Sequence, residues 1–204
     1  MNSDELPARP LLTVEELALS RGERRLFDAV GFSLEPGQLL LLRGPNGAGK
    51  SSLLLTLAGL LRPDAGRLVW PGDEPTPLHL LAHLPGVKTR LTLAENLDFW
   101  RSVNGPCGLL PEDALERVGL GGLGALDAGY LSAGQTKRLA LARLLVTDRL
   151  IWLLDEPTAS LDAAGDVLVE RLVAERLRTG GAVIAATHDD IGGATGTLTL
   201  GGAR

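Results

Sequence analysis

The most informative segment of this 204-residue chain reads Gly44-Pro45-Asn46-Gly47-Ala48-Gly49-Lys50-Ser51. It has the form G-x-x-x-x-G-K-[ST], follows the apolar run Gln38–Arg43 and opens a helical pattern over Lys50–Leu60. This order predicts a phosphate-binding loop, because glycines let successive backbone N–H groups face phosphate oxygens at a helix N-terminus. In such a loop Lys50 reaches the β- and γ-phosphates of a nucleotide and the Ser51 hydroxyl ligates Mg²⁺.

A second pattern predicts a buried strand, Leu150–Leu154, that ends in the two carboxylates Asp155 and Glu156. The carboxyl ends of parallel strands form the ligand-binding edge of an open α/β sheet. At that edge Asp155 can enter the coordination shell of Mg²⁺, and Glu156 can polarise the attacking water as a general base. The sequence therefore predicts that both carboxylates serve the same site as the phosphate loop.

Strand and helix patterns alternate along the chain, which predicts one α/β domain with a mostly parallel sheet. We expect the domain to cover residues 11–204, with a flexible tail at residues 1–10 and an all-helical insertion at approximately 92–148. The expected strands are Leu11–Leu19, Arg24–Leu34, Gln38–Arg43, Arg67–Trp70, Leu78–Leu84, Leu150–Leu154 and Ala182–Thr187. The expected helices are Lys50–Leu60, one that starts with a capping box at Thr92–Glu95, Pro111–Val118, Ala133–Val146 and Ala163–Arg178.

Composition narrows the class of protein. The 20 Lys and Arg are outnumbered by 25 Asp and Glu, and the net charge of −5 argues against a nucleic-acid partner held by a basic field. The single cysteine, Cys107, excludes an internal disulfide, and we expect an inert loop thiol there. No run approaches the roughly 20 apolar residues of a membrane span. Met1–Pro10 lacks the apolar core of a signal peptide, so we expect a cytoplasmic protein.

Three further motifs suggest a family. Leu131-Ser132-Ala133-Gly134-Gln135 opens a helix between the phosphate loop and the acidic strand, and it resembles the LSGGQ-type signature of ATP-binding-cassette (ABC) ATPases. Ser160-Leu161-Asp162 is similar to the D-loop of that family, and Thr187-His188 to its switch histidine. The resemblance covers about residues 11–200. It implies a P-loop NTPase with an N-terminal antiparallel β subdomain and an inserted α-helical subdomain beside the parallel sheet.

The resemblance also implies how ATP and Mg²⁺ are bound. Two copies of the chain would close head to tail, so that each ATP lies between the phosphate loop of one copy and the signature of the other. Asp162 would contact the partner copy, and His188 would sense the γ-phosphate as a catalytic residue beside Glu156. The implied nucleotide-binding residues are Arg21, Gly44, Pro45, Asn46, Gly47, Ala48, Gly49, Lys50, Ser51, Ser52, Ser132, Gly134, Gln135 and Asp162; Ser51 and Asp155 are the implied metal ligands.

Two positions depart from the family pattern. Arg21 stands where an aromatic residue usually stacks on adenine, and its planar guanidinium can stack on a base as well. Leu84 stands where the family has the Q-loop glutamine, and a leucine can neither ligate Mg²⁺ nor position water. Either His83 or a water molecule substitutes, or the coupling between nucleotide and partner is unusual in this chain. We expect hydrolysis to survive with weaker metal affinity.

A finer resemblance points to the ATP-binding subunits of haem exporters for cytochrome c biogenesis. It is carried by Pro85–Thr89 with Ala94–Leu97, and by Arg21–Arg24. It implies an integral membrane permease as partner and a peripheral location at the cytoplasmic face of the bacterial inner membrane. The alternatives are another ABC exporter or importer, a soluble ABC ATPase of translation or DNA repair, and a P-loop kinase or GTPase.

The remaining regions and residues have less specific interpretations. The region Leu84–Leu91 with Trp100 is either ordinary core or a docking groove for a helix of the membrane partner. We expect His79 to be structural or exposed, the pair Lys137-Arg138 to lie on a solvated helix face, and Arg143 to pack against the sheet.

Overall fold

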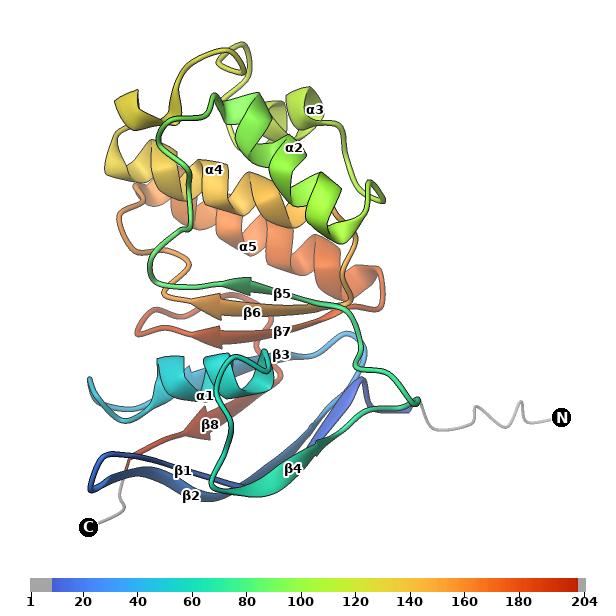
Figure 1. Cartoon of the computed structure of the whole chain (residues 1–204), viewed down its shortest axis with the longest axis vertical. Helices are drawn as coiled ribbons and strands as arrows, with labels where there is room; N and C mark the ends of the chain where they lie inside the picture. Colours follow the sequence, from blue (N-terminus) through green and yellow to red (C-terminus); the bar gives the residue numbers. More distant parts are fainter. Residues whose placement is uncertain (1–8, 202–204) are drawn as a thin grey trace, which may run out of the picture.

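A computed structural model describes residues 9–201, so residues 1–8 of the expected tail lie outside it. Its central layer is a parallel sheet of five strands in the order β5-β6-β7-β3-β8 (Figure 1). The strands are β3 (Leu39–Arg43), β5 (Leu78–Leu81), β6 (Ile151–Asp155), β7 (Ala182–Ala186) and β8 (Gly196–Thr199). β3, β6 and β7 are almost wholly apolar because both faces of the sheet are covered.

A second sheet of three antiparallel strands lies beside the first, in the order β2-β1-β4. Its strands are β1 (Leu12–Arg21), β2 (Arg24–Leu34) and β4 (Ala65–Val69). Helix α1 (Lys50–Leu57) lies between this sheet and the parallel one (Figure 1). The predicted fold class, a mostly parallel sheet with an N-terminal antiparallel β unit and inserted helices, is confirmed.

The remaining helices cover the other face of the parallel sheet (Figure 1). α2 (Leu93–Asn104), α3 (Pro111–Arg117), a 3₁₀ turn at Ala128–Tyr130 and α4 (Ala133–Leu145) all stand between β5 and β6 in the chain, and α5 (Ala163–Arg178) follows β6. α2 begins with the predicted capping box, in which Thr92 accepts from the backbone N–H of Glu95 and the Glu95 carboxylate accepts in return. None of the described helices is both long and apolar enough to cross a membrane.

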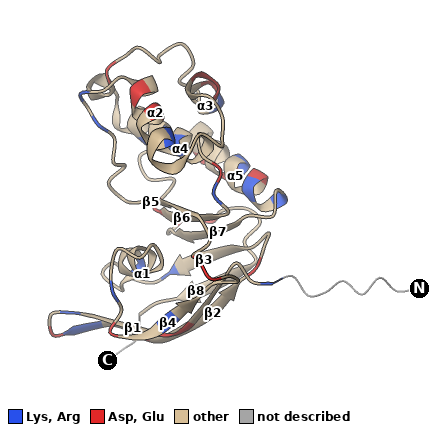
Figure 2. Cartoon of the chain, turned by 45° about the vertical axis from the view of Figure 1, so that its right-hand side comes forward, with Lys and Arg blue, Asp and Glu red and all other residues tan. Residues whose placement is uncertain are grey.

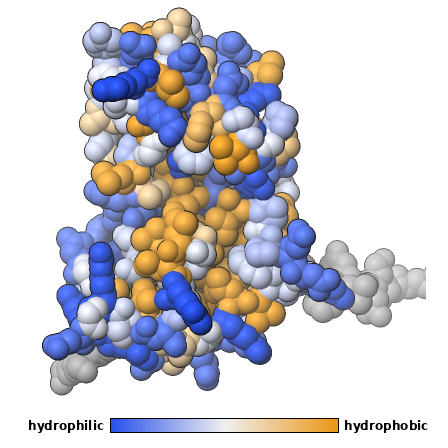
Figure 3. All heavy atoms as spheres, viewed as in Figure 1, coloured by the Kyte–Doolittle hydropathy of each residue, from blue (hydrophilic) through white to orange (hydrophobic). Residues whose placement is uncertain are grey.

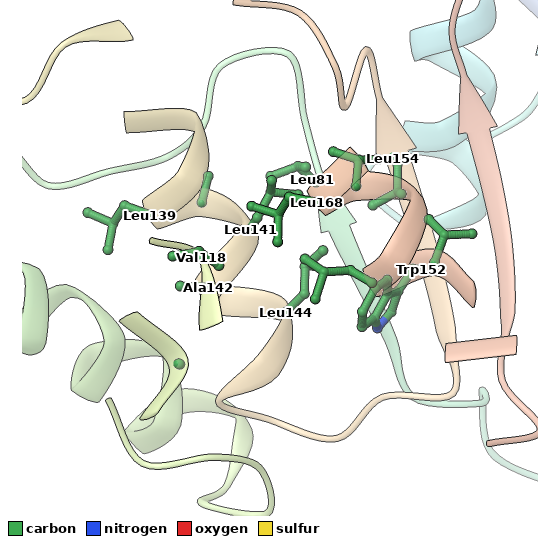
Figure 4. Packing of buried hydrophobic residues seen from close by; sticks show 14 of the residues in the cluster. Leu81, Val118, Leu139, Leu141, Ala142, Leu144, Trp152, Leu154 and Leu168 are labelled. Carbon is green, nitrogen blue, oxygen red and sulfur yellow. The ribbon is translucent and has the colours of Figure 1, made fainter. Parts of the chain in front are cut away.

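The parallel sheet separates two hydrophobic cores because successive strand side chains point to opposite faces. Leu39, Leu41, Trp152 and Leu154 pack with the helices α2 to α5. The residues between them along the strands, such as Leu42, Ile151 and Leu153, pack with α1 and the antiparallel sheet. Figure 4 shows the first core, where Leu141 and Leu144 of α4 lie toward Leu168 of α5 and Trp152 of β6, while Leu139 lies on the opposite side of α4.

Two predicted elements end three residues earlier than expected, and one strand was not predicted. The helix expected over Lys50–Leu60 ends at Leu57, since Gly59 turns the chain with a left-handed φ of 72°. The strand expected over Leu78–Leu84 ends at Leu81. β8 was not predicted, because Gly196–Thr199 is short and rich in small polar residues. It is a strand only through its pairing with β3 at the edge of the sheet.

The predicted structural alternative for His79 is confirmed. The ring is buried, with Nε2 2.7 Å from the Thr147 hydroxyl and 3.2 Å from its carbonyl oxygen. The pKa of His79 is lowered to about 4, chiefly by burial; the hydrogen bond to Thr147 opposes this effect and nearby arginines add to it. The folded state therefore keeps the ring neutral at pH values where the unfolded chain protonates it.

We expect this histidine to make the protein less stable in mild acid. Between its unfolded pKa near 6.5 and its folded pKa near 4, the unfolded state binds more protons, so the free energy of unfolding falls as the pH falls. The loss amounts to about 1 kcal/mol between pH of about 7.5 and about 5.5. Urea denaturation of the wild type and of His79→Asn at both pH values measures it, and the variant should lose that part of the pH dependence. An equal pH dependence in the two proteins would contradict the assignment.

Candidate functional site

An open pocket of about 500 Å³ lies at the carboxyl ends of the parallel strands, against the start of α1. Most of its lining comes from the predicted phosphate loop and the predicted acidic strand. The lining residues are Arg21, Arg24, Leu26, Asn46, Gly47, Ala48, Gly49, Lys50, Ser51, Ser52, His83, Asp155 and Glu156. Segments more than a hundred residues apart in the chain therefore face one cavity.

The glycine-rich loop owes its shape to backbone conformations that only glycine adopts without strain. Gly44 has a φ of 137°, and a Cβ built on it would lie 2.0 Å from the carbonyl oxygen of Leu200. Lys50 is buried at the start of α1, and its Nζ donates to the carbonyl oxygens of Gly44 at 2.7 Å and Pro45 at 3.4 Å. These contacts hold a cation inside the curve of the loop, where it can meet a polyphosphate.

The two carboxylates reach the pocket from the end of β6. Asp155 is the last residue of the strand and is 6% exposed. Glu156 follows with a φ of 47°, a left-handed conformation that is strained for a residue with a Cβ. Its backbone N–H donates to the carbonyl oxygen of Ala186 at the end of β7, over 2.8 Å. This turn directs the glutamate out of the sheet while its carboxylate stays only partly exposed.

His188 lies beside this turn, although it is not among the residues that line the pocket. Its Nε2 is 3.2 Å from Oδ1 of Asn46 in the loop and 3.7 Å from Oε1 of Glu156. Arg43, at the end of β3, donates to the carbonyl oxygen of Thr187 over 2.8 Å and pairs with Asp190. The histidine thus contacts the phosphate loop and the glutamate at once.

The tip of the β1–β2 hairpin forms one wall of the pocket. Arg21 lines it as predicted, while Arg24 and Leu26 were not predicted as site residues. Figure 2 shows Lys and Arg residues in blue at this tip. The Arg24 guanidinium lies over the loop, 3.7 Å from where a Cβ on Gly47 would be. In the sequence, only the cluster of arginines at this turn could have indicated a role for Arg24. The folded hairpin is what brings these arginines to the phosphate loop.

The departure at the Q-loop position is visible in the structure. His83 lines the pocket, whereas Leu84 is 80% exposed and is not among the lining residues. His83, which we expected as one possible substitute for the missing glutamine, therefore has access to the site, whereas Leu84 does not.

The signature residues lie outside this pocket. Ser132 caps α4 by accepting from the backbone N–H of Gln135, whose side chain accepts from Ser132 in return. Asp162 caps α5 through the backbone N–H of Gly165 and pairs with Arg138 over 3.1 Å, and these two contacts hold the pKa of its carboxyl below the usual value. Ser132 and Asp162 are both accessible, so a second molecule can reach them.

One expectation about α4 was wrong and another holds. Lys137 does not lie on a solvated face: it is 5% exposed, because its ammonium points inward to the carbonyl oxygen of Glu156, 2.6 Å away. Arg143 packs against the sheet as expected and donates to the carbonyl oxygen of Leu80, with burial lowering its pKa to about 10. Cys107 is a free, exposed thiol in a loop.

The donor set of the pocket suits Mg²⁺. The Ser51 hydroxyl and the Asp155 carboxylate both line it, and Mg²⁺ prefers oxygen ligands and keeps several waters besides those from phosphates. Among residues 9–201 no cluster of three or more His, Cys, Asp and Glu side chains could hold a metal without such help. The arrangement therefore fits a metal that arrives with a nucleotide.

Comparisons with known proteins agree with this geometry. The ABC transporter family model matches residues 27–159. The cytochrome c biogenesis ATP-binding export protein CcmA of Rhizobium johnstonii is 48% identical over 193 residues, which cover 89% of each chain. CcmA of Mesorhizobium japonicum is 46% identical over 93% of this chain and 98% of its own. Among solved structures, an ABC transporter ATP-binding protein from Pyrococcus furiosus superposes with a TM-score of 0.81 at 25% identity, over 93% of this chain and 96% of that one.

We expect Leu84→Gln to be tolerated in the purified protein. The side chain is exposed, so the free energy of unfolding should change by less than about 0.5 kcal/mol. ATP hydrolysis should stay intact or rise, because the glutamine restores a polar group next to the pocket. His83→Ala should instead raise the Mg²⁺ concentration needed for half-maximal turnover. Turnover of both variants across a Mg²⁺ titration tests this, and a collapse of activity in Leu84→Gln would show that its alignment with the Q-loop glutamine is wrong.

Proposed function

The chain belongs to the ABC transporter family, and from this premise we propose that it is the ATP-hydrolysing subunit of a haem exporter for cytochrome c biogenesis. The observation that carries the proposal is the meeting of Lys50, Ser51, Asp155 and Glu156 in one pocket. The identity of nearly half of all aligned residues with CcmA proteins supports the subfamily.

Each residue of the pocket has a separate role in the proposed hydrolysis. The backbone N–H groups of Gly44–Ser51 and the Lys50 ammonium bind the β- and γ-phosphates, and the Arg21 guanidinium stacks on the base. The Ser51 and Asp155 oxygens would hold Mg²⁺, which neutralises phosphate charge when bound. Glu156 accepts the proton of the attacking water, and His188 Nε2, 3.7 Å from Oε1 of Glu156, fixes the γ-phosphate. The products are ADP and inorganic phosphate.

One chain provides only part of this site. Ser132, Gly134 and Gln135 at the start of α4 form a helix N-terminus, which favours an anionic ligand, yet they do not line the pocket of their own chain. We infer that two copies close head to tail, with these residues on the γ-phosphate held by the other copy and Asp162 at the contact. Loss of that phosphate on hydrolysis lets the copies separate.

The surface suggests where a membrane permease docks. Apolar side chains gather across the middle of the face in Figure 3, over β5 and α1. Leu84 and Val103 are among the large apolar residues exposed in the described chain, and the half-exposed Phe99 stacks its edge on Trp100. The exposed side chains of Leu84, Phe99 and Val103 support the docking interpretation of Leu84–Leu91 and Trp100, with the chain held peripherally at the cytoplasmic face of the inner membrane.

Glu156→Gln should stop turnover without loss of nucleotide binding. The amide cannot accept the proton of water, and removal of a general base costs roughly 100-fold or more in rate. ATP then stays between two copies, so the variant should run as a dimer in size-exclusion chromatography with ATP and Mg²⁺. The matched control is Glu112→Gln, an exposed glutamate in the first turn of α3, which should behave as wild type. Rapid turnover by Glu156→Gln, or full activity of a strictly monomeric preparation, would refute this part of the proposal.

If the chain docks to a permease through the segment Leu84–Leu91, substitutions at two exposed aliphatic residues should affect binding differently. Leu84→Asp places a charge on the exposed segment that follows β5 and should release the chain from an integral membrane protein with which the wild type co-purifies from native membranes. Val167→Asp places the same charge on α5, where the side chain is 64% exposed, and should remain bound. Identification of the co-purified protein by mass spectrometry completes the test. Association with ribosomes or DNA instead of membranes would favour the soluble ABC ATPases.

A further inference from the structure

Lys137 makes a contact that the proposed mechanism does not use. It stands in the second turn of α4, the helix that Ser132 caps, and its Nζ donates to the backbone carbonyl oxygen of Glu156 over 2.6 Å. The contact spans nineteen residues and joins the helical part of the chain to the edge of the parallel sheet. Lys137 is buried, and burial of a charged side chain is costly, so this single hydrogen bond to a backbone carbonyl calls for a functional explanation.

The acceptor of this bond, Glu156, is a non-glycine residue of the pocket with a positive φ. Glu156 is held in a left-handed conformation, with a φ of 47°. Its N–H is fixed by Ala186 of β7 and its carbonyl by Lys137, so each side of the residue is tied to a different element. The direction of the Glu156 carboxylate therefore depends on where α4 stands relative to the sheet.

The same helix holds the segment that follows Glu156 at two more points. Arg138 pairs with Asp162 over 3.1 Å. Gly134 packs so closely that a Cβ built on it would lie 3.1 Å from the carbonyl oxygen of Ser160, itself at a left-handed φ of 71°. The first two turns of α4 and residues 156–162 thus form one connected unit.

The charged groups around the ammonium strengthen the tie. Burial lowers the pKa of Lys137, and the carboxylates of Asp155 and Glu156 act against that effect. The cation is therefore balanced by the two side chains that end β6, and it contacts the backbone of one of them. Substitution of Lys137 by an uncharged residue that cannot donate would remove both the hydrogen bond to the Glu156 carbonyl and the positive charge beside the two carboxylates.

We propose that Lys137 is a positioning residue that couples the signature helix to the general base of its own chain. The inference rests on the proposed function. In the head-to-tail dimer, Ser132 of α4 contacts the nucleotide on the other copy's loop, while Glu156 of the same chain acts on the nucleotide of its own loop. Lys137 joins these two ends, so closure of α4 on one ATP sets the geometry of hydrolysis at the other.

Steady-state kinetics of Lys137→Met and Lys137→Arg test the coupling. Met keeps the length of the side chain but cannot donate, and a misdirected base affects the chemical step more than binding. We expect kcat to fall at least about tenfold with KM changed less than about twofold, and the Hill coefficient for ATP to fall toward one. Lys137→Arg can still donate to the carbonyl and should recover most of kcat and the cooperativity.

Arg101→Met is the matched control. Arg101 is likewise a mostly buried cation that donates to one backbone carbonyl oxygen, that of Leu109 at 2.8 Å, but it lies in α2 away from Glu156. It should lower the melting temperature without lowering kcat. If Lys137→Met does not fold, Lys137→Leu, which also cannot donate a hydrogen bond, is measured in its place, with the same expected separation of kcat from KM.

The outcomes separate this inference from the proposed function. Wild-type kcat and cooperativity in Lys137→Met, together with an inactive Glu156→Gln, would overturn the coupling and leave the proposed function standing. Equal losses of kcat in Lys137→Met and Arg101→Met, in step with their melting temperatures, would show a merely structural role and overturn it too. Full turnover in Glu156→Gln would instead overturn the proposed function on which the coupling rests.

Discussion

Parallel pairing of β3, β7 and β6 is the constraint on which the site depends. Because these strands run in one direction with both faces covered, their carboxyl ends meet at a single edge. The phosphate loop leaves β3 there, the two carboxylates end β6 there, and His188 follows β7 there. This common direction brings Lys50 and Asp155 into one pocket.

The two hydrophobic cores hold different parts of the site against that edge of the sheet. One core joins the sheet to α1 and the antiparallel hairpin, so the helix that follows the loop and the hairpin that carries Arg21 pack against the sheet. The other core joins the sheet to α2, α4 and α5, which carry the signature and the residues that follow Glu156. The sheet side chains that separate the two cores are mostly fully buried leucines, valines and alanines, which leaves little room for the layers to shift independently.

Hydrogen bonds and ion pairs of arginine and lysine side chains link the layers next to the proposed site residues. Lys137 and Arg138 connect α4 to Glu156 and Asp162, and Arg43 connects β3 to Thr187 beside the histidine. Each contact crosses from one element to another by a cation on a backbone carbonyl or a carboxylate. The strained backbone of Glu156 persists because these neighbours hold it, which is how tertiary contacts maintain a conformation that its local sequence disfavours.

The amino-acid sequence alone determined the loop, the acidic strand, the capped helices and the fold class, because glycine spacing, strand-length apolar runs and capping boxes are local signals. It also indicated Arg21 and His83 as candidates for the two unusual positions. It missed β8, whose four residues form a strand only against β3, and it put Lys137 on a solvated face because a Lys-Arg pair on a helix is usually exposed. Arg24, Leu26 and Lys137 acquired their places only through tertiary structure, since the hairpin tip and α4 meet the sheet edge by packing across the chain, and no local pattern encodes that approach.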